Sequence, residues 1–405
     1  SRRSWLSESS DMNKIDRWLL PDGVEDTLPE NALKLEKGRR VLLDLFQSWG
    51  YEFVIPPMIE FLESLLTGTG KDLDLQTFKV IDQLTGRHMG LRADMTPQIA
   101  RIDAHSLHQV GATRLCYAGT VLHSRPDNML ASRTPMKVGA ELFGDSSWAA
   151  DLEIVSLMTA ALLALQTHDL QIELGDVSVF REILEQTEIP VDDHDRYFSL
   201  VQRKAHDELV KSAQQDNLDE RVTEMICELP LLCGGLEVLP EARRLFKDMD
   251  NVLAALDRLE FIAAGLTSRY ADVKVSFDLS ELRGYSYHTG AVFAAYAGSS
   301  GETIAKGGRY DHIGEVFGRR RAATGFDLHL LPLVDQITAS KTSPKIAVRS
   351  DPDGDQQALW NKIEALRSQG FRVVEGAIEY LDRDQELVWN GEQWQILGRV
   401  KNKKA

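Results

Sequence analysis

The stretch YAGTVLHSRPDNMLASRTPMKVGAELFG (Tyr117–Gly144) holds two strands around which the rest of the chain can be arranged. Two β-prone runs, Thr113–Val121 and Lys137–Phe143, flank a loop rich in Pro, Ser and Asn at Ser124–Pro135. The spacing predicts strand, loop and strand, and these two strands are the starting point for the fold.

Five further elements are predicted upstream from hydrophobic spacing and turn residues. They are the helix Glu30–Trp49, the strands Tyr51–Ile55, Phe78–Asp82 and His88–Leu91, and the helix Asp94–Ala104. Pro29 suits the first turn of the first helix, and Gly50 suits its C-terminal end. Gly86 supplies a positive-φ position between the second and third strands, which predicts a hairpin.

Downstream, strands return after a long helical segment. The predicted elements are the helix Trp148–Thr167, the strand Gln171–Leu174, a mostly helical insertion over about 180–260, the strands Val273–Asp278, Gly290–Ala295 and Ala323–Asp327, and a helix that starts near Tyr310. Strands on both sides of a helical insertion, together with hairpin turns, predict an α+β fold. We expect a mixed, mainly antiparallel sheet flanked by helices.

A polar linker, TASKTSP at Thr338–Pro344, predicts a second domain. Beyond it, Lys345–Val348, Asp355–Gln369 and Phe371–Val374 read as strand, helix and strand, and Asn390-Gly391 is typical of a hairpin turn. We therefore expect a domain over residues 1–337, which includes the helical insertion, and a small C-terminal α/β unit over residues 344–405.

Composition excludes several classes of protein. Hydrophobic residues make up 43% and charged residues 27% of the 405 residues, as in an ordinary globular chain. The apolar run Ile154–Leu165 is too short and too polar to span a bilayer, and the N-terminus lacks an apolar signal segment, so we expect a cytoplasmic protein. The three cysteines lack histidine partners at ligand spacing, which predicts buried thiols and no metal site. The net charge of −16 argues against a nucleic-acid partner.

Four segments, in order, resemble class II aminoacyl-tRNA synthetases and specifically histidyl-tRNA synthetase. WGYEFVIPPMIE (Trp49–Glu60) is similar to the dimer-forming first motif, LRADMTPQIAR (Leu91–Arg101) to the amino-acid segment LRPEGT, and ELRGYSYHTG (Glu281–Gly290) to the histidine-specific RG-x-x-YYT sequence. GGRYD (Gly307–Asp311) is identical to another segment of the family. The resemblance covers residues 18–332 and implies the antiparallel sheet of those synthetases.

The resemblance also implies a binding site for free histidine. The matching positions are Asp94 and Thr96 for the ammonium, Arg283 for the carboxylate, Glu141, Tyr287 and Tyr310 for the imidazole, and His288 where the family has Tyr. Polar groups aimed at both ring nitrogens reject ligands that leave them unpaired. Each residue also has a structural interpretation: a helix N-cap for the aspartate, core packing for the tyrosines, and structural ion pairs for the glutamate and the arginine.

The nucleotide-binding half of the family's site is not retained. In the second motif, His123 stands at the position of an ATP-binding arginine and Arg125 at that of an adenine-binding glutamate. In the third motif, Pro332 stands at the arginine position, and in the histidine pocket Lys137 replaces a glutamine. Preorganised donors stabilise the charge that develops on the phosphate, and removing one typically costs roughly 10²–10³ in rate.

A retained amino-acid half with a lost nucleotide half resembles the histidyl-tRNA synthetase paralogues that are regulatory subunits of ATP phosphoribosyltransferase. This resemblance implies a non-catalytic protein without a cofactor that joins a short-form catalytic subunit in a hetero-octamer and self-associates as a dimer. It also implies binding of histidine but not of tRNA, with activation and feedback inhibition of the first step of histidine biosynthesis. Two alternatives stay open: a histidyl-tRNA synthetase with divergent ATP motifs, and a stand-alone amino-acid-activating enzyme of the same fold.

Overall fold

The computed structural model describes residues 19–66, 71–126, 131–186, 189, 191–282, 284–285, 287–298, 301–337, 344–376 and 385–398. The chain divides into two compact units, Ser1–Ile337 and Thr338–Ala405. Within the described ranges, no helix combines the length and the apolar character needed to cross a bilayer.

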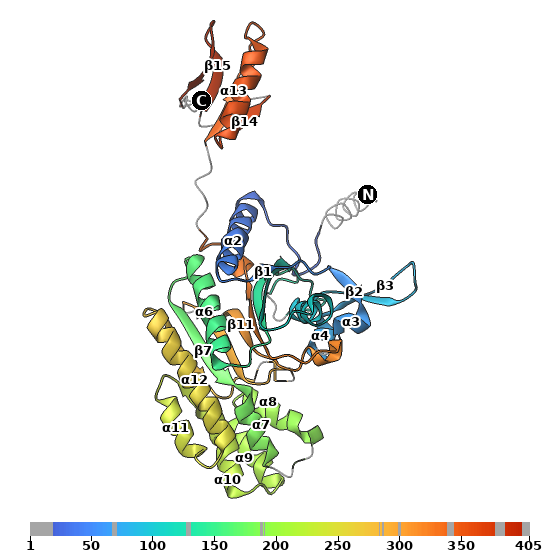
Figure 1. Ribbon diagram of the computed structural model, residues 1–405, viewed down its shortest axis with the longest axis vertical. Helices are drawn as coiled ribbons and strands as arrows, with labels where there is room; N and C mark the ends of the chain where they lie inside the picture. The colour runs from blue at the N-terminus through green and yellow to red at the C-terminus, as the bar shows by residue number, and fades with distance from the viewer. Residues whose placement is uncertain are drawn as a thin grey trace, which may run out of the picture. The chain divides into compact units, whose positions relative to one another are not determined.

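The first unit is built on one large sheet, whose strands run in the order β1-β5-β6-β12-β11-β10-β7-β9-β8 (Figure 1). The strands in that order are Glu52–Phe53, Thr113–Thr120, Met136–Phe143, Ala323–His329, Thr303–Arg309, Ala291–Ala297, Leu170–Asp176, Lys274–Asp278 and Cys233–Gly234. The pairs β1–β5 and β7–β9 are parallel, and the other neighbours are antiparallel. The predicted α+β fold with a mixed, mainly antiparallel sheet is therefore confirmed.

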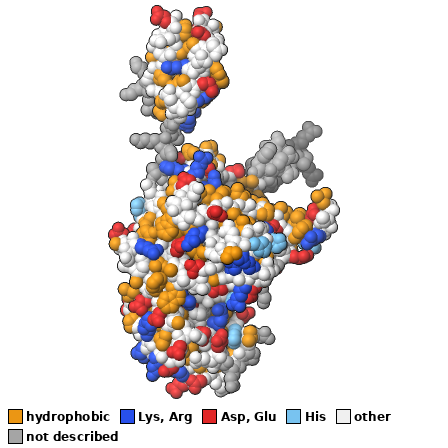
Figure 2. Space-filling model, viewed as in Figure 1, with side chains coloured by type: hydrophobic (Ala, Val, Ile, Leu, Met, Phe, Trp, Pro, Cys, Tyr) orange, Lys and Arg blue, Asp and Glu red, His pale blue; other side chains and the backbone are white. Residues whose placement is uncertain are grey.

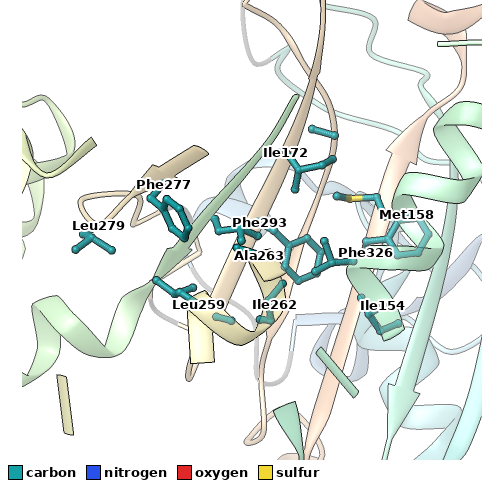
Figure 3. Close-up of a cluster of buried hydrophobic side chains, with 14 of the residues drawn as sticks. Ile154, Met158, Ile172, Leu259, Ile262, Ala263, Phe277, Leu279, Phe293 and Phe326 are labelled. Carbon is teal, nitrogen blue, oxygen red and sulfur yellow. The ribbon is translucent and has the colours of Figure 1, made fainter. Parts of the chain in front are cut away.

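Three long helices, α2 (Pro29–Ser48), α6 (Trp148–Ala164) and α12 (Asp250–Arg269), help to cover this sheet. Helix α6 is apolar nearly all round, so it is buried between α2, α12 and the sheet rather than exposed on one side. Figure 3 shows the resulting core, in which α6 and α12 meet the strands. Its labelled side chains are Ile154, Met158, Ile172, Leu259, Ile262, Ala263, Phe277, Leu279, Phe293 and Phe326.

A helical segment interrupts the sheet between β7 and β9, as predicted for about 180–260. Its helices are α7 (Val177–Glu185), α8 (His194–Gln202), α9 (His206–Gln215), α10 (Glu220–Glu228), α11 (Val238–Leu245) and α12, with short 3-10 turns at Val191–Asp193 and Leu229–Leu231. Asp176 caps α7, because its side chain accepts a hydrogen bond from the backbone N–H of Ser178 at 3.0 Å. Although this segment separates β7 from β9 in the sequence, the two strands are neighbours in the same sheet.

A smaller antiparallel sheet, in the order β2-β4-β3, is formed by residues that precede β5 in the sequence. Its strands are Ile59–Phe61, His88–Leu91 and Phe78–Ile81, and it includes the predicted hairpin. The short helices α3 (Leu62–Leu66) and α4 (Lys71–Gln76) precede β3. Helix α5 (Thr96–Arg101) follows β4 and continues as one turn of π-helix, Ile102–Leu107.

The second unit is a four-stranded sheet in the order β14-β13-β15-β16 with one helix. The strands are Arg372–Glu375, Lys345–Val348, Gln385–Trp389 and Trp394–Leu397, and the helix α13 is Gln356–Ser368. The β-α-β arrangement and the hairpin at Asn390-Gly391 are confirmed. The Asn390 side chain fixes that turn by accepting hydrogen bonds from the backbone N–H groups of Glu392 and Gln393, at 2.9 and 2.8 Å.

Two predictions of local structure were wrong or incomplete. No helix starts near Tyr310: its backbone N–H bonds to Ala323 O at 2.8 Å, and the chain then turns through the 3-10 segment Glu315–Phe317 to Gly318 at φ 84°. The strand β11, Thr303–Arg309, was not predicted, because its Lys and two Gly residues disfavour a strand until neighbours on both sides pair with it.

Candidate functional site

The register of the central strands gathers polar side chains on one face of the sheet. Side chains directly opposite each other on paired strands share a face, and so do alternate residues of one strand. On β6 and β12, Glu141 lies opposite Gly325, Gly139 opposite Asp327, and Lys137 opposite His329. Lys137 and Glu141 therefore share one face of β6, and Asp327 lies on the same face of the neighbouring strand β12.

A pocket of about 100 Å³ opens over this surface. This volume is well below the roughly 300–1,000 Å³ typical of sites for drug-sized ligands, so it suits a small molecule. Six of the seven predicted site residues line the pocket together: Asp94, Thr96, Glu141, Tyr287, His288 and Tyr310. The seventh, Arg283, lies outside the described residues.

Glu141 is the centre of a buried hydrogen-bond network. Its Oε1 accepts bonds from the hydroxyl groups of Thr96 at 2.9 Å and Tyr117 at 3.0 Å, and its Oε2 accepts one from Tyr310. Burial raises the pKa of the Glu141 carboxyl to about 8, although the three hydroxyl donors oppose the rise. Near neutral pH this carboxyl can therefore either donate or accept a hydrogen bond.

Tyr287 and His288 form another wall of the pocket. The two rings stack with centroids 4.3 Å apart, and Tyr287 remains 38% exposed, at the edge of the pocket. His288 is buried, its Nδ1 donates to the backbone carbonyl of Arg309 at 3.1 Å, and burial lowers the pKa of its imidazole to about 4. His288 is therefore a neutral ring, held by the GGRYD segment.

Two glycines keep the pocket open. A Cβ atom added at Gly325 would collide with the Glu141 carboxylate, and one at Gly308 would lie 2.7 Å from the ring of His288. Any side chain at either position must displace a site residue. Gly308 thereby lets the backbone approach the site closely.

Opposite Glu141, the pocket carries a cluster of charges. The Lys137 ammonium lies 3.1 Å from Asp327 Oδ2 and 3.5 Å from Asp94 Oδ1. Burial alone would lower the pKa of Lys137, but the two carboxylates raise it above its ordinary value. Asp94 Oδ1 also accepts the backbone N–H groups of Met95 and Thr96, at 2.6 and 3.4 Å, although α5 has Met95 and not Asp94 as its N-cap residue.

The residues at the positions of the synthetase arginines have other roles in the described structure. His123 is buried, and its Nε2 donates to the backbone carbonyl of Ala93 at 3.0 Å. Pro332 lies in a 3-10 turn, Leu331–Leu333, and Arg125 is exposed. No guanidinium stands at either ATP-binding arginine position.

The sequence did not single out three charged residues that line the pocket: Glu281, Lys306 and Asp327. Asp327 had a detectable signal, because it is the one charge in the largely apolar run Ala323–Leu328, and a charge is costly to bury unless it is paired. Lys306 belongs to the strand that was not predicted.

Comparisons with known proteins identify the family. Residues 23–333 match the family model for histidyl-tRNA synthetase, and residues 347–397 match the C-terminal domain of the ATP phosphoribosyltransferase subunit HisZ. The ATP phosphoribosyltransferase regulatory subunit of Saccharophagus degradans is 50% identical over 364 residues, which cover 90% of this chain and 92% of the relative. That of Pseudomonas syringae pathovar tomato is 48% identical over 394 residues, which cover 95% and 99%.

Solved structures show the same fold. An ATP phosphoribosyltransferase regulatory subunit/histidyl-tRNA synthetase from Bacillus halodurans superposes with a TM-score of 0.78 at 28% identity, over 90% of this chain and 94% of that one. The HisG:HisZ complex of ATP phosphoribosyl transferase from Thermotoga maritima contains a chain that superposes with a TM-score of 0.57 at 18% identity, over 75% and 98%. With identity near 50% along nearly its whole length, the chain belongs to the family of ATP phosphoribosyltransferase regulatory subunits.

Proposed function

We propose that the pocket over β6 and β12 binds free histidine and that this binding is the inhibitory signal for a catalytic ATP phosphoribosyltransferase partner. The observation that supports it most is that one small pocket holds two different kinds of polar group, a hydrogen-bonded carboxyl and a charged carboxylate cluster. Glu141 with its hydroxyl donors suits an imidazole, and the carboxylate of Asp94 suits an ammonium.

Regulation requires that histidine bind the inhibited state of the complex more tightly than the active state, since only differential affinity shifts an equilibrium. A coupling free energy of about 1–3 kcal/mol gives roughly 5–150-fold changes in affinity, which suffices for feedback inhibition. The loop that carries Tyr287 and His288 is a candidate for that coupling. Arg181 of the helical insertion donates to the backbone carbonyl of His288 at 3.1 Å, so a change in the loop reaches α7.

The partner is proposed to be a short-form catalytic subunit, with which the chain forms a hetero-octamer, and the chain itself is proposed to dimerise. Exposed apolar side chains near the first motif support self-association. They include Ile55, Ile81 and Leu84, which are 76%, 62% and 95% exposed, and Figure 2 shows hydrophobic side chains gathered over the β2-β4-β3 region.

We further propose that the chain does not activate histidine as an adenylate and does not bind tRNA. The synthetase reaction needs cationic donors at the α-phosphate, and His123 and Pro332 occupy those positions in the sequence. Histidine-dependent pyrophosphate–ATP exchange by the purified chain would contradict this and favour an active histidyl-tRNA synthetase.

The decisive experiment mixes the chain with a short-form catalytic subunit and measures stimulation of phosphoribosyl transfer and its inhibition by histidine. Tyr310→Phe removes one hydroxyl donor to the buried Glu141, so the histidine concentration for half-inhibition should rise by about 10–100-fold. Tyr296→Phe is the matched control, because the Tyr296 hydroxyl donates to Glu173 outside the pocket. Equal inhibition of both variants, or no stimulation by the wild-type chain, would overturn the proposal.

A further inference from the structure

Asp327 has a feature that its ion pair with Lys137 does not explain. The residue is only 7% exposed and lines the pocket, yet within the described structure its Oδ1 atom accepts no hydrogen bond. Lys137 binds the other oxygen, Oδ2, and the Nε2 atom of the His329 ring lies 3.8 Å from Oδ1, beyond hydrogen-bond distance. A buried carboxylate oxygen without a donor is costly, so it indicates a missing partner.

His329 does not neutralise this oxygen. The imidazole is largely buried, and burial together with the nearby Lys137 ammonium lowers its pKa to about 4. The ring is therefore uncharged at neutral pH. Among the described residues, the Lys137 ammonium is therefore the charged donor to Asp327, and it bonds to the other oxygen, Oδ2.

Asp327 and Glu141 lie at different positions on the same face of the sheet. Asp327 is two residues beyond Gly325, which pairs with Glu141, and two residues of a strand span about 6.6–6.8 Å. Both side chains line the pocket, so one ligand can contact both. Gly139, opposite Asp327, has no side chain, and its place is taken by the ring of Tyr117, whose hydroxyl donates to Glu141.

We propose that Asp327 is a specificity residue for the ligand: its free Oδ1 accepts a hydrogen bond from the α-ammonium of histidine, alongside Asp94. Lys137 is then a positioning residue: it pairs with both carboxylates and holds them in place, while the carboxylates themselves contact the ligand. This inference rests on the proposed histidine site and adds the group that makes it select a free α-amine.

The test combines a variant with a ligand that lacks the amine. Calorimetry on the full chain compares histidine with imidazolepropionate, which keeps the ring and the carboxylate but has no amino group. Asp327→Asn should weaken histidine binding by about 10–100-fold, the usual effect of a hydrogen bond between charged groups. The same variant should leave imidazolepropionate binding within about twofold of wild type, because that ligand never meets Oδ1.

The matched control is Asp278→Asn, which removes another largely buried aspartate that pairs with a lysine, Lys204 at 2.8 Å, away from the pocket. It should bind both ligands as wild type does. Thermal unfolding checks that each variant folds; if Asp327→Asn does not, Asp327→Ser is read in the same way.

Equal weakening of both ligands, or no weakening of either, would refute the role of Asp327 and leave the histidine site standing. A wild-type chain that binds no histidine, or whose affinity is unchanged by Tyr310→Phe, would instead refute the proposed function itself.

Discussion

The pH dependence of histidine binding should depend on the Glu141 carboxyl. Its pKa of about 8 means that free protein carries the proton at neutral pH, whereas the imidazole of free histidine, with a pKa of about 6.5, does not. In the proposed complex, one proton is shared between the carboxyl and the ring. From about pH 6.5 to about pH 8, binding therefore neither takes up nor releases a proton, and the affinity should be flat.

Outside that pH range, the affinity for histidine should fall in both directions. Below about pH 6.5 both partners are protonated, so binding must release one proton and the affinity falls by about tenfold per pH unit. Above about pH 8 neither partner carries the proton, so binding must take one up and the affinity falls again. The alkaline side also includes titration of the ligand's own amine, which requires a control.

Glu141→Gln is that control, since the amide resembles the protonated carboxyl and does not titrate. The variant should keep the acid decline and lose the part of the alkaline decline that belongs to Glu141. Calorimetry in buffers of different ionisation enthalpy measures both the affinity and the protons exchanged. Identical profiles for wild type and variant, or a full proton exchanged near pH 7.2, would refute the shared-proton argument.

Three other substitutions test the packing around the site. Gly325→Ala places a methyl group on the Glu141 carboxylate and should abolish histidine binding in calorimetry, whereas Gly398→Ala, with no atom within 4 Å, should not change it. Asp151→Asn removes a charge buried against Arg309 and should lower the free energy of unfolding by about 3–5 kcal/mol in urea denaturation, because the buried Arg309 then keeps only the less buried Asp311 as an acidic partner among the described residues. Glu260→Gln, which breaks an exposed ion pair, should change it by less than about 1 kcal/mol. Leu259→Ala empties part of the core in Figure 3 and should cost about 2–5 kcal/mol in the same assay.

Local sequence patterns predicted much of the fold because they report on local physics. The hairpin Phe78–Ile81 to His88–Leu91 and the turn at Asn390-Gly391 follow from turn residues beside β-prone runs. Strand β11 was missed because its identity comes from its neighbours: a Lys-Gly-Gly segment pairs on both edges only once β10 and β12 are present. Tertiary pairing overrode propensity there.

The site was predicted unevenly for a related reason. Glu141 and Tyr310 were found through the family resemblance, and the structure brings them into contact. Asp327 was not found, because its place in the pocket is evident only from its pairing with Lys137, a residue 190 positions away in the sequence. A single sequence shows the spacing within one motif, but not which residues of two distant strands will share a face.

The central position of β12 beside β6 has a consequence for synthesis of the chain. The Lys137–Asp327 contact joins residues separated by 190 positions, and ribosomes add about 5–20 residues per second, so β6 emerges roughly 10–40 s before its partner. During that interval one edge of β6 has no permanent neighbour and is open to wrong pairing. A polypeptide that ends before β12 therefore lacks part of the pocket lining, including Gly325 and Asp327.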